Sequence, residues 1–171
     1  MKKRALLISI LLHTLLLMVV YMFQGVIFPF LRLGGLVPLL LPIACTGVAL
    51  YEGRDTGGVV GLFAGILCDV SFNQPVGVFT VFLTLTGLVV GAISDAVVLR
   101  GFVTYYLSCA VVLVISAFIQ MFPILVLERL PMQLLIGTAI QQTIYSLVLA
   151  LPIWFFIRAL GRFTDRAPTM F

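Results

Sequence analysis

Residues 57–69 read Gly-Gly-Val-Val-Gly-Leu-Phe-Ala-Gly-Ile-Leu-Cys-Asp, an apolar stretch in which Gly57, Gly61 and Gly65 recur at every fourth position. Four-residue spacing places these glycines on one face of a helix. Glycines on one face let another helix backbone approach closely, as in the small-xxx-small interfaces of membrane helices. The stretch therefore predicts a membrane helix with a packing groove, filled either by a neighbouring helix of this chain or by the helix of a partner.

Asp69 continues the same four-residue series at the end of this stretch. A carboxylate within the apolar part of a membrane costs on the order of 3 kcal/mol. Asp69 is therefore expected to face the bundle interior, a wet cavity or a partner. Polar stripes on later helices predict one shared site in the outer half of the membrane, formed by Asp69, Thr80, Thr84, Gln141 and Gln142. The alternative is a set of separate hydrogen bonds between helices.

The remainder of the chain is similarly apolar. Of its 171 residues, 63% are hydrophobic and 9% are charged, whereas soluble domains have about 25% charged residues. So few charges cannot build a water-exposed surface, so lipid must cover most of the outside. A membrane-spanning helix needs about 20 mostly apolar residues. The candidate spans cover 5–27, 36–51, 57–73, 76–94, 102–126 and 133–158.

The predicted fold is all-α: one polytopic domain over residues 1–171, built as a six-helix transmembrane bundle. The second and third spans are short and are separated only by residues 52–55, which predicts a tight helical hairpin. The alternative is a re-entrant segment in this pair, which leaves five crossings.

The basic residues predict the orientation of the chain in the membrane. Lys and Arg are enriched in the cytoplasmic segments of membrane proteins. If both termini are cytoplasmic, Arg32 and Arg129 lie outside and the other basic residues lie inside: Lys2, Lys3, Arg4, Arg54, Arg100, Arg158, Arg162 and Arg166. Because these residues end apolar runs rather than form one basic patch, the net charge of +4 predicts no nucleic-acid partner.

The residue patterns of enzymes and metal sites are missing from this sequence. His13 is the single histidine, and there is no GxSxG or P-loop pattern. Cys45, Cys68 and Cys109 lie in apolar runs without CxxC spacing. We therefore expect no catalytic residue, no metal and no cofactor. His13 is expected to make a hydrogen bond between helices, with a proton relay as the alternative.

The middle of the chain resembles the MreD family of bacterial cell-shape proteins. The elements that carry the resemblance are Tyr51-Glu52-Gly53, the GxxxGxxxD pattern from Gly61 to Asp69, the loop motif with Pro75 and Gly77, and the later Gly87 and Gly91. The first span and the last two spans match mainly by hydropathy. One departure is Leu39, since many family members have a polar or acidic residue after the proline at position 38.

The resemblance implies a multi-pass protein of the bacterial inner membrane that belongs to the rod, or elongation, complex. Its implied partners are MreC, a bitopic protein with a large extracytoplasmic part, and other members of the complex that directs lateral peptidoglycan synthesis. The implied fold is similar to the membrane-embedded substrate-binding subunits of ECF vitamin transporters. No catalytic residue is carried over, because the family is known for none.

Three functions are open at this point. The first is a non-enzymatic scaffold whose lateral surface binds membrane lipid and the transmembrane helix of a partner, with a second copy of the chain as a further candidate. The second is a small-molecule-binding subunit of an ECF-type transporter, which requires that the outer polar residues enclose a cavity. The third is a site for an undecaprenyl-type lipid precursor.

Overall fold

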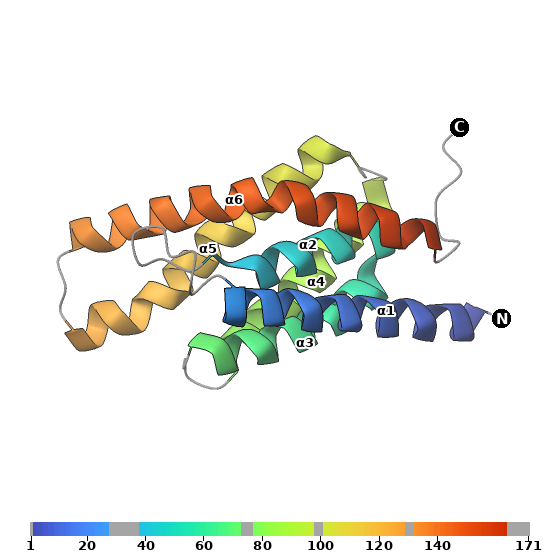
Figure 1. Ribbon diagram of the computed structural model, residues 1–171, viewed down its shortest axis with the longest axis horizontal. Coiled ribbons are helices and arrows are strands. Elements are labelled where there is room, and N and C mark those ends of the chain that lie inside the picture. Colours follow the sequence, from blue (N-terminus) through green and yellow to red (C-terminus); the bar gives the residue numbers. More distant parts are fainter. Residues whose placement is uncertain (1, 28–37, 73–76, 98–100, 129–131, 164–171) are drawn as a thin grey trace.

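The computed structural model describes residues 2–27, 38–72, 77–97, 101–128 and 132–163, and within these residues every regular element is a helix. In chain order the elements are α1 (Lys2–Met22), its π-helical continuation η1 (Phe23–Ile27), α2 (Leu40–Glu52), α3 (Arg54–Phe72), α4 (Val78–Val97), α5 (Phe102–Glu128) and α6 (Met132–Phe163) (Figure 1). The all-α prediction is confirmed, and each of the six predicted spans overlaps one α-helix of the described residues.

Three of these helices contain a segment long and apolar enough to cross a membrane. The segments are Val78–Ala96 in α4, Phe102–Met121 in α5 and Ile136–Ala159 in α6. The apolar parts of α1 and α2, Ser9–Gly25 and Leu40–Glu52, are shorter. With 13 residues, α2 is about 20 Å long, less than the roughly 30 Å of a bilayer core.

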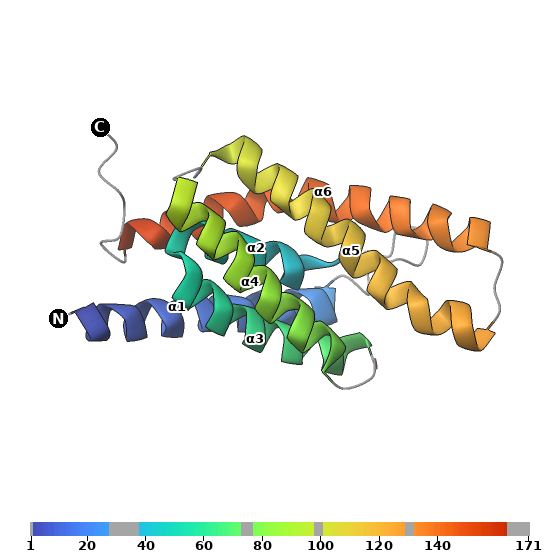
Figure 2. The same ribbon diagram turned by 180° about the vertical axis from the view of Figure 1, so that it is seen from behind.

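The short helix α2 forms the centre of the bundle. Twelve of its 13 residues are buried, and it packs against all five other α-helices. The views from opposite sides in Figures 1 and 2 show the longer helices arranged around it. A helix that is apolar on all sides is expected to be buried on all sides, and α2 meets that expectation.

Two groups of buried side chains fix α2 in this position. On one side Leu41, Cys45 and Val48 pack in a cluster with Leu17 of α1 and Val60 of α3. On the other side α2 packs in a second cluster with α5 and α6, made of Leu39, Ile43, Leu50, Tyr105, Cys109, Leu113 and Ala150. The outer helices pack in the order α1, α3, α4, α5 and α6 around α2.

Candidate functional site

The glycine face of α3 packs against the backbone of α4. A Cβ atom on Gly61 would collide with the Leu83 carbonyl oxygen, and a Cβ on Gly65 would collide with Cα of Thr80. A Cβ on Gly57 would lie 2.8 Å from the Gly87 carbonyl oxygen. The packing groove is therefore filled by α4 of the same chain, and it is not open to the helix of a partner.

Asp69, at the end of α3, binds the first turn of α4. Its carboxylate accepts hydrogen bonds from the N–H groups of Gly77 (2.9 Å), Phe79 (2.9 Å) and Thr80 (3.2 Å), and from the Thr80 hydroxyl (2.6 Å). The first N–H groups of a helix have no carbonyl partner within the helix. Asp69 supplies that partner from the neighbouring helix, so the carboxylate acts as the N-terminal cap of α4.

Gly77 provides the backbone conformation that this cap requires. Its φ angle is +102°, in the left-handed region that glycine adopts without steric cost. The turn so formed directs the Gly77 N–H to Asp69. Pro75, the other residue of the predicted loop motif, lies outside the described residues.

Asp95, at the end of α4, makes the equivalent contact with the start of α3. Its Oδ2 accepts a hydrogen bond from the Arg54 N–H at 3.0 Å. Gly53, which joins α2 to α3, has a φ of +88°, and a Cβ there would lie 2.6 Å from Asp95 Oδ1. Each of the two antiparallel helices thus ends in a carboxylate at the other's N-terminus, where the helix dipole favours negative charge.

Asp95 is not among the polar residues predicted from the sequence. Its position could have indicated the contact, because Asp95 lies at the end of the helix that follows Asp69. In two antiparallel neighbouring helices, the end of one helix lies beside the start of the other.

The remaining predicted polar residues separate into two groups. Thr84 lies one turn beyond Thr80 on α4, and its hydroxyl donates to the Thr80 carbonyl at 2.6 Å. Gln141 and Gln142 lie on α6, which packs against α2 and α5. The Gln141 residue is exposed, whereas Gln142 is buried. The structure therefore brings Asp69 and Thr80 into contact and places the two glutamines beside other helices.

The polar contact near Gln142 holds the start of α2. Ser146 donates to the Gln142 carbonyl at 2.7 Å and accepts the Leu39 N–H at 2.9 Å. Gln24 accepts the next N–H, from Leu40, at 3.3 Å. Leu39 is the residue at which the chain departs from the pattern of the family it resembles. Its backbone N–H bonds Ser146 of α6, and its side chain is part of the core.

A second buried polar cluster joins α1 to α2. The Ser9 hydroxyl donates to Glu52 Oε2 at 2.6 Å, and both residues are buried. His13 Nδ1 lies 2.8 Å from the Ser9 carbonyl oxygen in the same helix. The interhelical bond predicted for His13 is thus made one turn earlier by Ser9. Sequence reasoning treated Glu52 as part of a connection and missed its burial.

Four buried side-chain atoms among the described residues make no hydrogen bond: His13 Nε2 and the hydroxyls of Thr14, Thr56 and Ser116. Among the described residues, no group of three or more His, Cys, Asp and Glu side chains could hold a metal ion.

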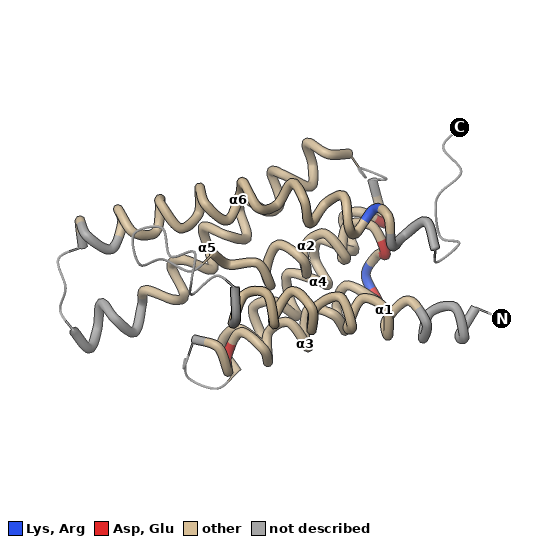
Figure 3. Tube along the Cα trace, in the orientation of Figure 1, with Lys and Arg blue, Asp and Glu red and all other residues tan. Residues whose placement is uncertain are grey.

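The end of the bundle at which α1 begins carries aromatic and charged side chains. Trp154 Nε1 donates to the Tyr51 hydroxyl at 2.5 Å, and the Arg158 guanidinium lies 5.1 Å from the centre of the Trp154 ring. Figure 3 shows most of the described charged residues near this end, whereas Asp69 lies near the other end of α3. Amphipathic aromatic side chains are enriched where a membrane meets water.

Comparison with known proteins adds one finding. The family model described as rod shape-determining protein MreD matches residues 2–164. No curated protein and no solved structure matches the chain. The family match includes all six α-helices of the described residues, and it agrees with their apolar character. The chain therefore belongs to the MreD family of rod shape-determining membrane proteins.

Proposed function

We propose that this protein is a non-enzymatic component of the rod complex in the bacterial inner membrane. In this proposal it binds the transmembrane helix of a bitopic, MreC-type protein and supports lateral peptidoglycan synthesis. Membership of a rod shape-determining family supports the proposal. The observation that carries the mode of binding is the extensive apolar lateral surface of the bundle.

Outward-facing apolar side chains repeat along the outer helices. On α1 they form a stripe of residues that are each about half exposed or more: Leu11, Leu15, Met18 and Met22. The equivalent stripe on α4 consists of Val81, Leu85, Val89 and Ile93. Two connections are very short: Gly53 alone joins α2 to α3, and three residues separate α5 from α6. Partners are therefore expected to contact helix faces, where van der Waals packing drives association in lipid.

We also propose that both termini are cytoplasmic. The start of α1 and the end of α6 lie at the same end of the bundle (Figure 1). Arg54 begins α3, antiparallel to the α2 that precedes it, and Arg158 lies in the last turns of α6. The charge bias of membrane proteins assigns an end rich in Lys and Arg to the cytoplasm.

The alternative of an ECF-type ligand-binding subunit has less support. It requires a cavity lined by free polar groups near the outer face. Asp69, the charged residue of the predicted site, instead uses its carboxylate for four hydrogen bonds to α4 and its preceding turn. We therefore favour the scaffold.

A deletion and co-purification experiment tests the proposal. Removing the gene from a rod-shaped host should give rounded cells, and the wild-type gene should restore rods. The tagged chain, solubilised in mild detergent, should co-purify with a bitopic membrane protein. Retained rod shape after deletion, or co-purification with an ATPase-linked transporter instead, would contradict the scaffold.

A scan of the lateral surface identifies the face that binds. Paired tryptophan substitutions are made at Leu11 and Leu15 on α1, at Val81 and Leu85 on α4, and at Leu107 and Val111 on α5. All six residues are more than half exposed, so each pair changes the surface with little effect on the core. One pair should abolish co-purification while the other two serve as its controls. Equal yields from all three pairs would contradict binding through these faces.

A further inference from the structure

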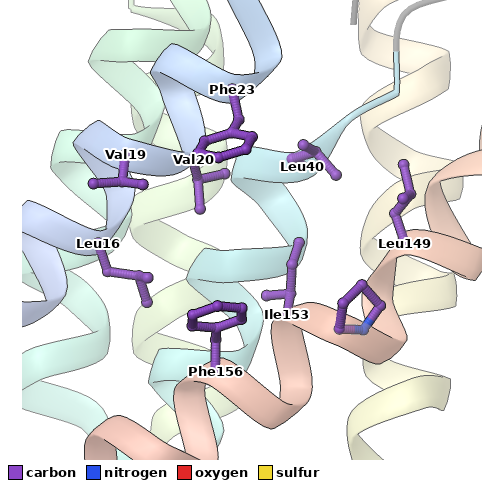
Figure 4. Close-up of a pocket in the computed structure, with 9 residues that line it drawn as sticks. Leu16, Val19, Val20, Phe23, Leu40, Leu149, Ile153 and Phe156 are labelled. Carbon is purple, nitrogen blue, oxygen red and sulfur yellow. The ribbon is translucent and has the colours of Figure 1, made fainter. Parts of the chain in front are cut away.

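A groove of about 310 Å³ lies between α1 and α6. Figure 4 shows side chains from the two helices facing each other across it, with Leu40 of α2 near one end. Every residue that lines the groove has a hydrocarbon side chain: Leu16, Val19, Val20, Phe23, Leu40, Leu149, Pro152, Ile153 and Phe156. The groove thus separates the first and last helices of the ring that surrounds α2.

The chemistry of the lining excludes water as the occupant. A buried water needs two to four polar partners, and a cavity of about 150 Å³ lined by Leu, Ile and Phe stays dry and binds benzene. The α1–α6 groove is about twice that volume. An empty groove would deprive its walls of dispersion contacts, so an apolar molecule is favoured.

The groove is continuous with the lateral surface that the bilayer covers. At its rim, Val19 is 47% exposed, Phe23 is 50% exposed and Phe156 is 66% exposed. Hydrocarbon chains of the membrane therefore reach the groove directly from the surrounding lipid.

The size of the groove indicates whether a lipid or a protein occupies it. An α-helix with its side chains is about 10–12 Å across, and a stable protein partner contacts about 20–30 residues on each side. The groove offers nine residues. We propose that it binds one acyl chain of a membrane phospholipid, which lies between α1 and α6 and fills the gap between them.

Native mass spectrometry of the full chain in mild detergent tests this inference. The wild-type protein should retain one phospholipid per chain. Val19→Trp fills the groove and should reduce the retained fraction about tenfold, the effect of a loss of about 1.4 kcal/mol. Met18→Trp is the matched control, because Met18 is 51% exposed on the adjacent, outward stripe of α1. It should retain lipid as the wild type does.

A second pair of variants probes the opposite wall. Leu149→Trp should reduce lipid retention, and Val148→Trp, at a residue 59% exposed, should not. Size-exclusion chromatography and thermal unfolding establish that each compared variant is folded.

Several results would overturn the inference: no lipid on the wild type, equal retention in both members of each pair, or a retained mass that belongs to an isoprenoid phosphate. Unchanged lipid retention in Val19→Trp together with loss of a bitopic partner, or of a dimer, would assign the groove to a protein instead. The measurement of retained lipid needs no protein partner. The acyl-chain inference can therefore be rejected while the scaffold proposal stands.

Discussion

Asp69 is a structural cap in this bundle, at a position where the sequence suggested a polar site. In hydrocarbon an unsatisfied backbone N–H costs several kcal/mol, because no water can replace its partner. Asp69 satisfies such groups at the start of α4, and its own charge is stabilised by the same bonds. The cost of placing a carboxylate in the membrane is thereby offset locally.

Replacing Asp69 with alanine should lower the free energy of unfolding by about 1–3 kcal/mol, because buried N–H groups lose their acceptor. Unfolding of the purified protein in detergent measures the change. Thr84→Val is the control. The Thr84 hydroxyl bonds a carbonyl of its own helix, so its loss should matter little. Equal effects of the two substitutions would contradict the capping role of Asp69.

His13 should occupy one tautomer. The Ser9 carbonyl can only accept a hydrogen bond, and His13 Nδ1 lies 2.8 Å from it, so the proton belongs on Nδ1 and not on Nε2. Nitrogen-15 NMR can read this state directly, because the chain has one histidine. A spectrum of the Nε2–H tautomer would show that the Ser9–His13 contact is not formed.

At the scale of elements, α3 and α4 form a closely packed antiparallel hairpin. Glycines on both helices bring the backbones together: a Cβ on Gly91 would lie 2.6 Å from Cα of Arg54, and Gly57 faces Gly87. Carboxylates at the two ends, Asp69 and Asp95, bind the N-terminus of the opposite helix. Close packing and the two end contacts favour the same register, so the hairpin should move as one unit.

The close approach predicts contrasting effects of alanine at two helical glycines. Gly61→Ala should destabilise the protein by about 1–3 kcal/mol, because the added methyl meets the backbone of α4. Gly137→Ala, on α6, has no atom within 4 Å of the new methyl and should raise stability by up to about 1 kcal/mol through helix propensity. Thermal unfolding of both variants in detergent measures the difference. Similar melting temperatures would mean that α3 and α4 pack less closely than described.

At the scale of the whole molecule, the bundle is a ring of five helices around α2. The bilayer contacts the ring, whereas α2 is almost entirely buried inside it. This arrangement explains how a helix of 13 residues can form part of a membrane bundle: its N-terminal end need not reach water, since Ser146 and Gln24 accept hydrogen bonds from the N–H groups of Leu39 and Leu40.

The proposed orientation predicts which single cysteines react from outside. Ser71 and Asp55 are exposed at opposite ends of α3, and the native cysteines are buried. In spheroplasts, an impermeant thiol reagent should label Ser71→Cys and leave Asp55→Cys unlabelled. Inverted vesicles should give the opposite pattern, and labelling of Asp55→Cys from outside would reverse the proposed topology.

The sequence by itself determined the helices and the environment. Three apolar runs are long enough to cross a membrane, and the whole chain is so poor in charge that lipid is its only suitable solvent. In lipid a backbone must hydrogen bond within its own helix. The spacing of Gly57, Gly61 and Gly65 also predicted close packing without naming the neighbour. These are local properties, which periodicity and composition report directly.

Only the tertiary structure decided which faces meet. The predicted polar set divides between the α3–α4 hairpin and α6, Asp69 becomes a cap, and Glu52 is buried against Ser9. Each of these outcomes depends on the rotation and order of helices distant in the chain. That order is set by the summed contacts of all six helices around α2, and no short stretch of sequence contains this information.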